Sequence, residues 1–187
     1  MVLPWDELNN LQAKIEQTLT FEQTETGTKQ KFDRDKCLDI IYDYLVYCYV
    51  MGVDNANEQL SSSIKTNDKE MRDTIYKKVA GKDYKERIEE YADNGDLMSI
   101  MKVAETEGHR DMNTASLVTA NKAGARYKRW VTMNDDRVRD THDYLEGMTV
   151  PIDRMFVTYN GDMTMFPGEF GIADEDINCR CTLSYSY

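Results

Sequence analysis

Proline and cysteine are scarce in this sequence, which has three prolines and four cysteines among 187 residues. Few prolines leave long stretches free to form uninterrupted helices, because proline removes a backbone donor and clashes with the preceding turn. Four cysteines are too few for a small disulfide-rich secreted scaffold. The first residues lack the basic and apolar segments of a secretion signal. We therefore expect free or metal-bound thiols in a reducing compartment.

Long apolar runs and an excess of positive charge are also missing. No stretch approaches the roughly 20 consecutive apolar residues that a bilayer-spanning helix needs, so we expect no membrane partner. The formal net charge is -11, and a uniformly acidic surface repels DNA and anionic membranes. Binding of nucleic acid would therefore need a local basic patch. The hydrophobic content of 41% is nevertheless enough for a packed core.

The first two-thirds of the chain has apolar residues at helical spacing. The pattern and its capping residues predict helices over residues 6–18, 33–60, 67–79, 83–91 and 96–122. Gly52 is expected to bend or break the second helix, where Cys37 and Cys48 lie on one face and suit core packing. The polar segment 21–30 is expected to be a loop.

The pattern changes after Gly124. Strands are expected over residues 126–132, 148–150, 155–159, 163–166 and 177–185, with a short helix over 136–144. Asn160-Gly161 is a strong hairpin signal between two of these strands. The sequence therefore predicts an α+β fold, with a helical N-terminal two-thirds followed by a small C-terminal α+β unit containing a short antiparallel sheet. We place the boundary between a helical region, 1–95, and a second region, 96–187.

One of the two histidines and two of the four cysteines lie in this C-terminal region. Thiolates and imidazole are the usual zinc ligands, and Cys179, Cys181 and His142 supply three of the four donors of a tetrahedral site. The fourth donor would come from one of three nearby aspartates, Asp143, Asp153 or Asp162. Two alternatives stay open. The cysteines pack as small hydrophobic residues on a strand, or Cys179 acts as a thiolate nucleophile with His142 as its base.

Charged residues form two further candidate sites. Residues 122–142 contain six basic and three acidic side chains, a patch suited to phosphates or an acidic partner unless its arginines pair within the chain. The segment 105–110 is a polar band in an otherwise apolar helix, with Glu107 and Arg110 at i,i+3 spacing. This band either docks against the arginine-bearing segment or forms a solvated helix face.

Several blocks of the C-terminal half resemble one known family. These blocks are residues 106–110, Trp130 with Thr132, the run 136–142 containing Arg137 and Arg139, residues 145–147, Asp153 with Phe156, residues 167–168, and 177–181 containing Asn178 and Arg180. Their order and spacing over about residues 100–185 resemble the phage head morphogenesis domain of the Mu F-like minor head proteins of tailed bacteriophages. The family commonly has arginine where this chain has Glu105.

This resemblance implies a minor capsid protein that acts in procapsid assembly near the portal and in the handling or delivery of DNA. The expected partners are the portal and other head proteins, with DNA bound by the local basic patch. The expected location is the capsid interior of the virion, and the host cytoplasm during assembly. The resemblance makes His142, Cys179 and Cys181 candidate zinc ligands, and gives structural or interaction roles to the other matched polar residues and Trp130. If the chain is a minor capsid protein, we expect no enzymatic activity. The alternative is a metal- or thiol-dependent hydrolase that acts during head maturation.

Overall fold

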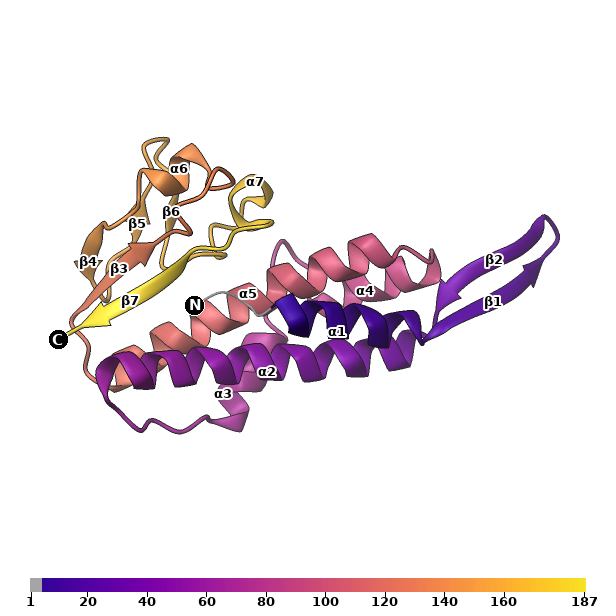
Figure 1. Cartoon of the computed structure of the whole chain (residues 1–187), viewed down its shortest axis with the longest axis horizontal. Helices are drawn as coiled ribbons and strands as arrows, with labels where there is room; N and C mark the ends of the chain where they lie inside the picture. Colours follow the sequence, from indigo (N-terminus) through magenta and orange to yellow (C-terminus); the bar gives the residue numbers. More distant parts are fainter. Residues whose placement is uncertain (1–4) are drawn as a thin grey trace.

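Five helices build an elongated body in the computed structural model, which describes residues 5–187 (Figure 1). The five are α1 (Trp5–Glu16), α2 (Arg34–Leu60), α3 (Asp68–Ile75), α4 (Tyr84–Asp93) and α5 (Leu97–Lys122). The two long helices, α2 and α5, run side by side and form the most extensive contact of the fold. Met1 to Pro4, which bear on the expected absence of a secretion signal, lie outside the described residues.

Side-chain caps fix where these helices begin. Asp33 accepts a hydrogen bond from the backbone N–H of Lys36 at the start of α2, and Asn67 caps α3 in the same way. Asp83 forms a capping box with Glu86 at the start of α4. Each cap satisfies a backbone donor that has no partner within the helix. The five expected helices are therefore confirmed, with boundaries shifted by a few residues.

Two expectations for the N-terminal region are wrong. The segment expected as a loop forms a hairpin of β1 (Leu19–Thr24) and β2 (Gly27–Phe32), which projects from one end of the body (Figure 1). Both faces of this hairpin are mostly exposed and polar, so it lacks the alternation that marks a strand. Gly52 does not break α2, which continues to Leu60; its missing side chain lets the backbone of Met112 on α5 approach closely.

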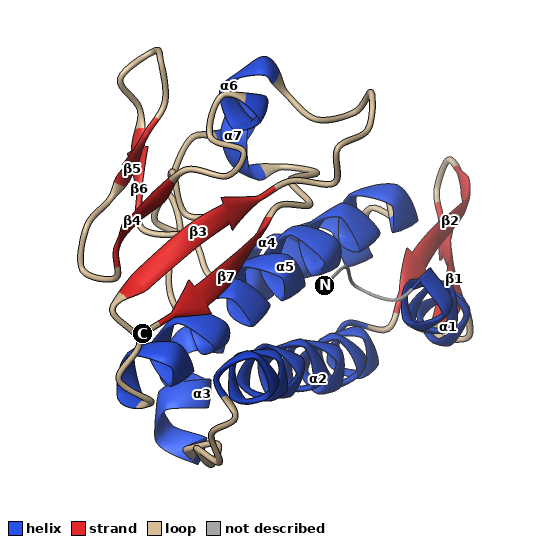
Figure 2. Cartoon of the chain, turned by 60° about the vertical axis from the view of Figure 1, so that its left-hand side comes forward, coloured by secondary structure: helices blue, strands red, loops and turns tan. Residues whose placement is uncertain are grey.

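A three-stranded antiparallel sheet organises the C-terminal unit (Figure 2). The central strand β3 (Tyr127–Val131) pairs with β4 (Thr149–Pro151) on one side and β7 (Thr182–Ser186) on the other. A second small hairpin joins β5 (Phe156–Val157) to β6 (Met163–Thr164), and α6 (Asp140–Asp143) and α7 (Ala173–Asp176) are single turns. Trp130, Leu145 and Phe156 are fully buried at the centre of this unit.

The expected α+β class is confirmed, but two C-terminal boundaries were wrong. The short helix expected over 136–144 is reduced to α6, and the last strand begins only at Thr182. Residues 177–181 instead form an irregular turn, in which Asn178 adopts a left-handed conformation with φ of 60°. Asparagine is among the few residues that tolerate this conformation. Among residues 5–187, no helix is long and apolar enough to cross a membrane.

Candidate functional site

His142, Cys179 and Cys181 converge in the C-terminal unit, and all three are buried. His142 comes from α6, and the two cysteines come from the turn that leads into β7. The Nδ1 atom of His142 lies 3.6 Å from the Cys179 sulfur and 3.5 Å from the Cys181 sulfur. A tetrahedral zinc ion bound by sulfur and nitrogen separates these donors by about 3.5 Å. Both nitrogen–sulfur distances therefore match those that a shared zinc ion requires.

A second layer of side chains fixes the His142 ring. Its Nε2 atom lies 3.0 Å from Glu175 Oε2, and the hydroxyl group of Thr141 donates to the same oxygen at 2.8 Å. The ring stacks on Phe170 and meets the edge of Trp130. Orientation of a ligating imidazole by a carboxylate on its other nitrogen is the usual support of a metal-bound histidine. Nδ1 is thereby directed to the two sulfur atoms.

The two thiols influence each other's protonation. A hydrogen bond between the two sulfur atoms, together with burial, raises the pKa of Cys179. The same hydrogen bond lowers the pKa of Cys181 and outweighs the opposing effect of burial. The opposite directions mark Cys181 as the member of the pair that loses its proton more readily to form a thiolate. Such a thiolate is the form of cysteine that binds a metal.

The aspartates that the sequence offered as a fourth ligand lie outside this cluster. Among the described residues, only this histidine and these two cysteines form a group of three possible metal ligands whose donor atoms all lie within 4.8 Å of one another. Asp143 and Asp153 are exposed, and Asp162 lies in the turn of the β5–β6 hairpin. The donor set within residues 5–187 is therefore two thiols and one imidazole.

Two polar residues of α5 hold the backbone next to this cluster; the sequence placed His109 in the polar band without a partner and did not identify Asn113. His109 donates its Nε2–H to the carbonyl oxygen of Cys181 at 2.8 Å. Asn113 donates to the same carbonyl and to that of Pro167. Burial lowers the pKa of His109 to about 4, so the ring is neutral at pH 7. These contacts attach the C-terminal unit to the middle of α5, directly behind a candidate ligand.

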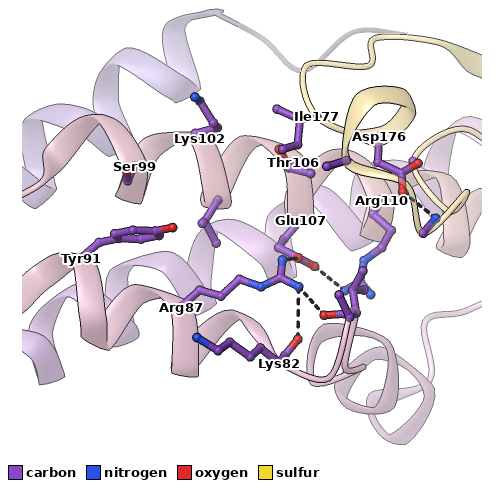
Figure 3. Close-up of a pocket in the computed structure, with 16 residues that line it drawn as sticks. Lys82, Arg87, Tyr91, Ser99, Lys102, Thr106, Glu107, Arg110, Asp176 and Ile177 are labelled. Carbon is purple, nitrogen blue, oxygen red and sulfur yellow. Dashed lines mark hydrogen bonds and ion pairs between the residues drawn. The ribbon is translucent and has the colours of Figure 1, made fainter.

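A buried cluster of charged residues lies on α5 within one helical turn of His109 (Figure 3). The Glu107 carboxylate bridges Arg87 of α4 and Arg110, with N–O distances of 2.7 Å to each. Arg110 also contacts Asp111 at 3.0 Å, and burial raises the pKa of that aspartate to about 7. The expected i,i+3 pair is thus present. Residues 107–110 of the polar band are buried, with Glu107 against Arg87 of α4 and His109 against the turn before β7, so the alternative of a solvated face is wrong.

In the basic segment 122–142, some charged residues pair within the chain and others stay exposed. Arg180 forms two hydrogen bonds with Asp135, at 2.6 and 2.7 Å, and this pairing lowers the pKa of Asp135 to about 2. Arg139 donates to the carbonyl oxygen of Ile177. Lys128 is buried and donates to the carbonyl oxygen of Met165 at 2.8 Å. Three arginines of the segment are exposed, namely Arg126, Arg129 and Arg137.

Three arginines and an asparagine line a hollow of about 460 Å³ next to the cluster of His142 and the two cysteines. The wall is formed by Glu105, Arg137, Arg139, Asn178 and Arg180. Arg137, Arg139, Asn178 and Arg180 also line a smaller recess that reaches His142 and Cys181. The matched arginines thus surround the approach to the candidate metal ligands. Burial raises the pKa of the opposing Glu105 carboxyl, while the nearby Arg180 and Arg137 act in the other direction.

Comparison with known proteins places this architecture in a family. Residues 66–184 match the family described as "Phage Mu protein F like protein". The chain belongs to this family. The matched range begins just before α3 and includes α4, α5 and the C-terminal unit almost to its end.

Two curated proteins are similar in sequence to part of this chain. The chain is 34% identical over 85 residues to the minor head protein GP7 of Bacillus phage SPP1. This match covers 44% of the chain and 28% of GP7. The chain is also 37% identical over 89 residues to the NAD(+)--arginine ADP-ribosyltransferase EFV of Enterococcus faecalis. That match covers 44% of the chain and 18% of the enzyme. The chain therefore spans less than a third of either relative. No solved structure matches it.

Proposed function

We propose that this protein is a minor head protein that joins the procapsid of a tailed phage near the portal. The family match carries the proposal, because it covers both the helices around the charged cluster and the C-terminal unit. The name of the SPP1 relative as a minor head protein supports it. In this role the partners are the portal and other head proteins. The protein then resides in the capsid interior, after assembly in the host cytoplasm.

Quantitative mass spectrometry of purified procapsids and heads tests this role. The expected result is a low, fixed ratio of this chain to the portal protein in both particles. Co-purification with empty and full particles through a density gradient separates incorporation from surface adhesion. Absence of the chain from particles, despite its abundance in infected cells, would contradict the proposal.

We further propose that His142, Cys179 and Cys181 hold a zinc ion that acts as a structural clasp. The ion would tie α6 to the turn before β7. The sulfur–nitrogen distances of 3.5 and 3.6 Å and the carboxylate behind His142 support this assignment. A clasp of this kind contributes directly to folding, because the site does not exist in the unfolded chain.

Substitution of one ligand tests the clasp. Cys179→Ser is expected to lower bound zinc from about one ion per chain to near zero and to lower the melting temperature. Cys48→Ala is the matched control, since Cys48 is buried in the helical core far from the cluster. The control is expected to lose stability and keep its zinc, as measured by elemental mass spectrometry. Equal zinc content in Cys179→Ser and wild type would contradict the assignment.

A hydrolase acting during head maturation is the second candidate function. The observation that favours it is the set of three protein donors, since catalytic zinc sites keep one position for water or substrate. Against it, Cys179 is buried and its pKa is raised, so it is a poor nucleophile. Rapid alkylation of Cys179 near neutral pH would favour a thiol enzyme, and protection from alkylation would favour the clasp.

The proposed role includes contact with DNA through the exposed arginines at positions 126, 129 and 137. Three phosphate contacts predict that the logarithm of the DNA affinity falls with the logarithm of salt concentration with a slope of about -2.7. Arg137→Gln is expected to reduce this slope by about 0.9. A slope near zero would restrict the protein to protein partners.

A further inference from the structure

The outer face of the β5–β6 hairpin is apolar. Side chains alternate along this segment, so Phe156 and Thr158 point into the core while Met155, Val157 and Tyr159 point outward. A strand at the surface of an antiparallel sheet normally carries polar residues on its solvent side. Here the solvent side carries Met155, Val157 and Tyr159 in place of polar residues.

Two neighbouring side chains extend this face into a continuous patch. Met163 is the cross-strand partner of Val157, so the two side chains lie on the same side of the hairpin. Tyr144 packs edge-on against Tyr159, with ring centroids 5.7 Å apart. The five members of this hairpin patch are each 44–58% exposed. They are Tyr144, Met155, Val157, Tyr159 and Met163.

The β5–β6 hairpin lies on the side of the C-terminal unit that is away from α2 and α5 (Figures 1 and 2). The opposite side of the hairpin packs inward through Phe156, whose ring meets that of Trp130 at 5.1 Å. The unit therefore uses one side of the hairpin for its own core and leaves the other to solvent. Contiguous exposed apolar patches mark interaction sites, whereas single exposed apolar residues need no explanation. Tyrosine and methionine are also enriched in protein interfaces.

The charges around the hairpin patch indicate the kind of partner. Asp143 adjoins Tyr144, Asp162 adjoins Met163, and Asp153 lies two residues before Met155. Glu146 lies two residues after Tyr144, and Arg154 is the one basic residue within two positions of a patch member, so these sequence neighbours carry a net charge of -3. A second copy of this chain would bring an equally acidic border to the contact, on a protein whose net charge is -11. Opposed like charges disfavour the pairing of two copies, whereas a partner with a basic border would complement the acidic border of this patch.

We propose that the hairpin patch is the docking surface for another head protein, which presents an apolar surface bordered by lysine or arginine. The proposal rests on the role in head assembly argued above and assigns a specific surface to it. The tyrosine pair and the two methionines provide the apolar contact, and the aspartates select a basic partner.

Site-specific photo-crosslinking in purified heads tests this assignment. Val157 is replaced by the photoreactive residue p-benzoylphenylalanine, and Met98, exposed on α5, receives the same replacement as a control. The expected result is a crosslink from position 157 to one head protein, at a site flanked by basic residues, and little product from position 98. A crosslink to a second copy of this chain, or none although the chain is present in heads, would overturn the proposal. Absence of the chain from heads would contradict the proposed function itself.

Side-chain truncation gives a second, quantitative test. Tyr159→Ala is expected to reduce the number of copies per head about tenfold, because central aromatic residues dominate interface energy. Phe21→Ala removes an even more exposed aromatic ring from the β1–β2 hairpin and is expected to leave incorporation unchanged. Unfolding curves of both variants should coincide with wild type, since neither side chain is in the core. Normal incorporation of Tyr159→Ala would contradict the proposal.

Discussion

Replacement of Gly52 by alanine should destabilise this protein, although alanine is the better helix former. Gly52 lies in the middle of α2, where the added Cβ atom would be 2.1 Å from the carbonyl oxygen of Met112 and 3.0 Å from the Cβ atom of Ala115. Both neighbours belong to α5. The nearest atom belongs to the helix backbone, so a change of rotamer cannot relieve the contact. The two long helices would have to move apart.

Two opposing terms set the size of the effect. Alanine gains up to about 1 kcal/mol of helix propensity over glycine. A carbon–oxygen contact normally lies at about 3.3 Å or beyond, so a 2.1 Å separation requires a shift of more than about 1 Å. Overpacking of this kind costs about 1–3 kcal/mol, and the upper end applies where backbone must move. We expect a net loss of about 2 kcal/mol, or about 4–8 °C in melting temperature for a chain of this length.

Urea denaturation followed by circular dichroism measures the loss, with two control variants. At Gly108 an added Cβ would meet side-chain atoms of Tyr44 and Cys48, at 2.8 and 2.9 Å. These side chains can adjust, so Gly108→Ala should cost less than Gly52→Ala. Asp54→Ala changes an exposed position of the same helix and should stay within about 0.5 kcal/mol of wild type. A Gly52→Ala protein as stable as wild type would refute the close approach of α2 and α5.

Two further predictions concern the contact between α5 and the C-terminal unit. Asn113→Ala leaves the Pro167 carbonyl without its buried donor and should cost about 1–3 kcal/mol of unfolding free energy, measured by denaturation; an unchanged value would contradict the contact. His109 has a pKa of about 4 in the folded protein and about 6.5 when unfolded, so the unfolded state binds more protons between these values and stability is lost as pH falls through this window. The stability of wild type relative to His109→Gln should therefore fall by about 2 kcal/mol between pH 7 and pH 5, and parallel pH profiles would disprove this linkage.

The long helices could be predicted from the sequence because two independent signals agree there. Apolar residues recur at helical spacing, and Asp33, Asn67, Asp83 and Asp96 stand where a cap is needed. The β1–β2 hairpin has neither signal. It is solvent-exposed on both faces, so no alternation of apolar and polar residues separates it from a loop. The ladder between its strands is a backbone property that side-chain pattern does not encode.

The candidate site shows the same division. His142, Cys179 and Cys181 could be grouped from their residue types alone, because thiols and imidazole are rare in this chain and share a chemistry. His109 and Asn113 could not be placed, since polar residues on a helix ordinarily face water. Their partners are the carbonyl groups of Pro167 and Cys181, 54–72 residues away in the chain. Only the tertiary fold brings those acceptors to α5.

The burial of polar residues along one face of α5 follows from this arrangement. A helix that packed on α2 alone would bury one apolar stripe and leave the rest to solvent. Helix α5 is instead covered by α2 on one side, by Arg87 of α4 on another and by the turn before β7 on a third. Glu107 contacts Arg87 of α4, and His109 and Asn113 contact the turn before β7, so protein groups replace water around these three side chains. The Cys181 carbonyl is therefore held from the helix side and its thiol faces His142, so movement of α5 relative to the C-terminal unit would displace a candidate zinc ligand. A partner that binds the hairpin patch acts on the same unit from its opposite side.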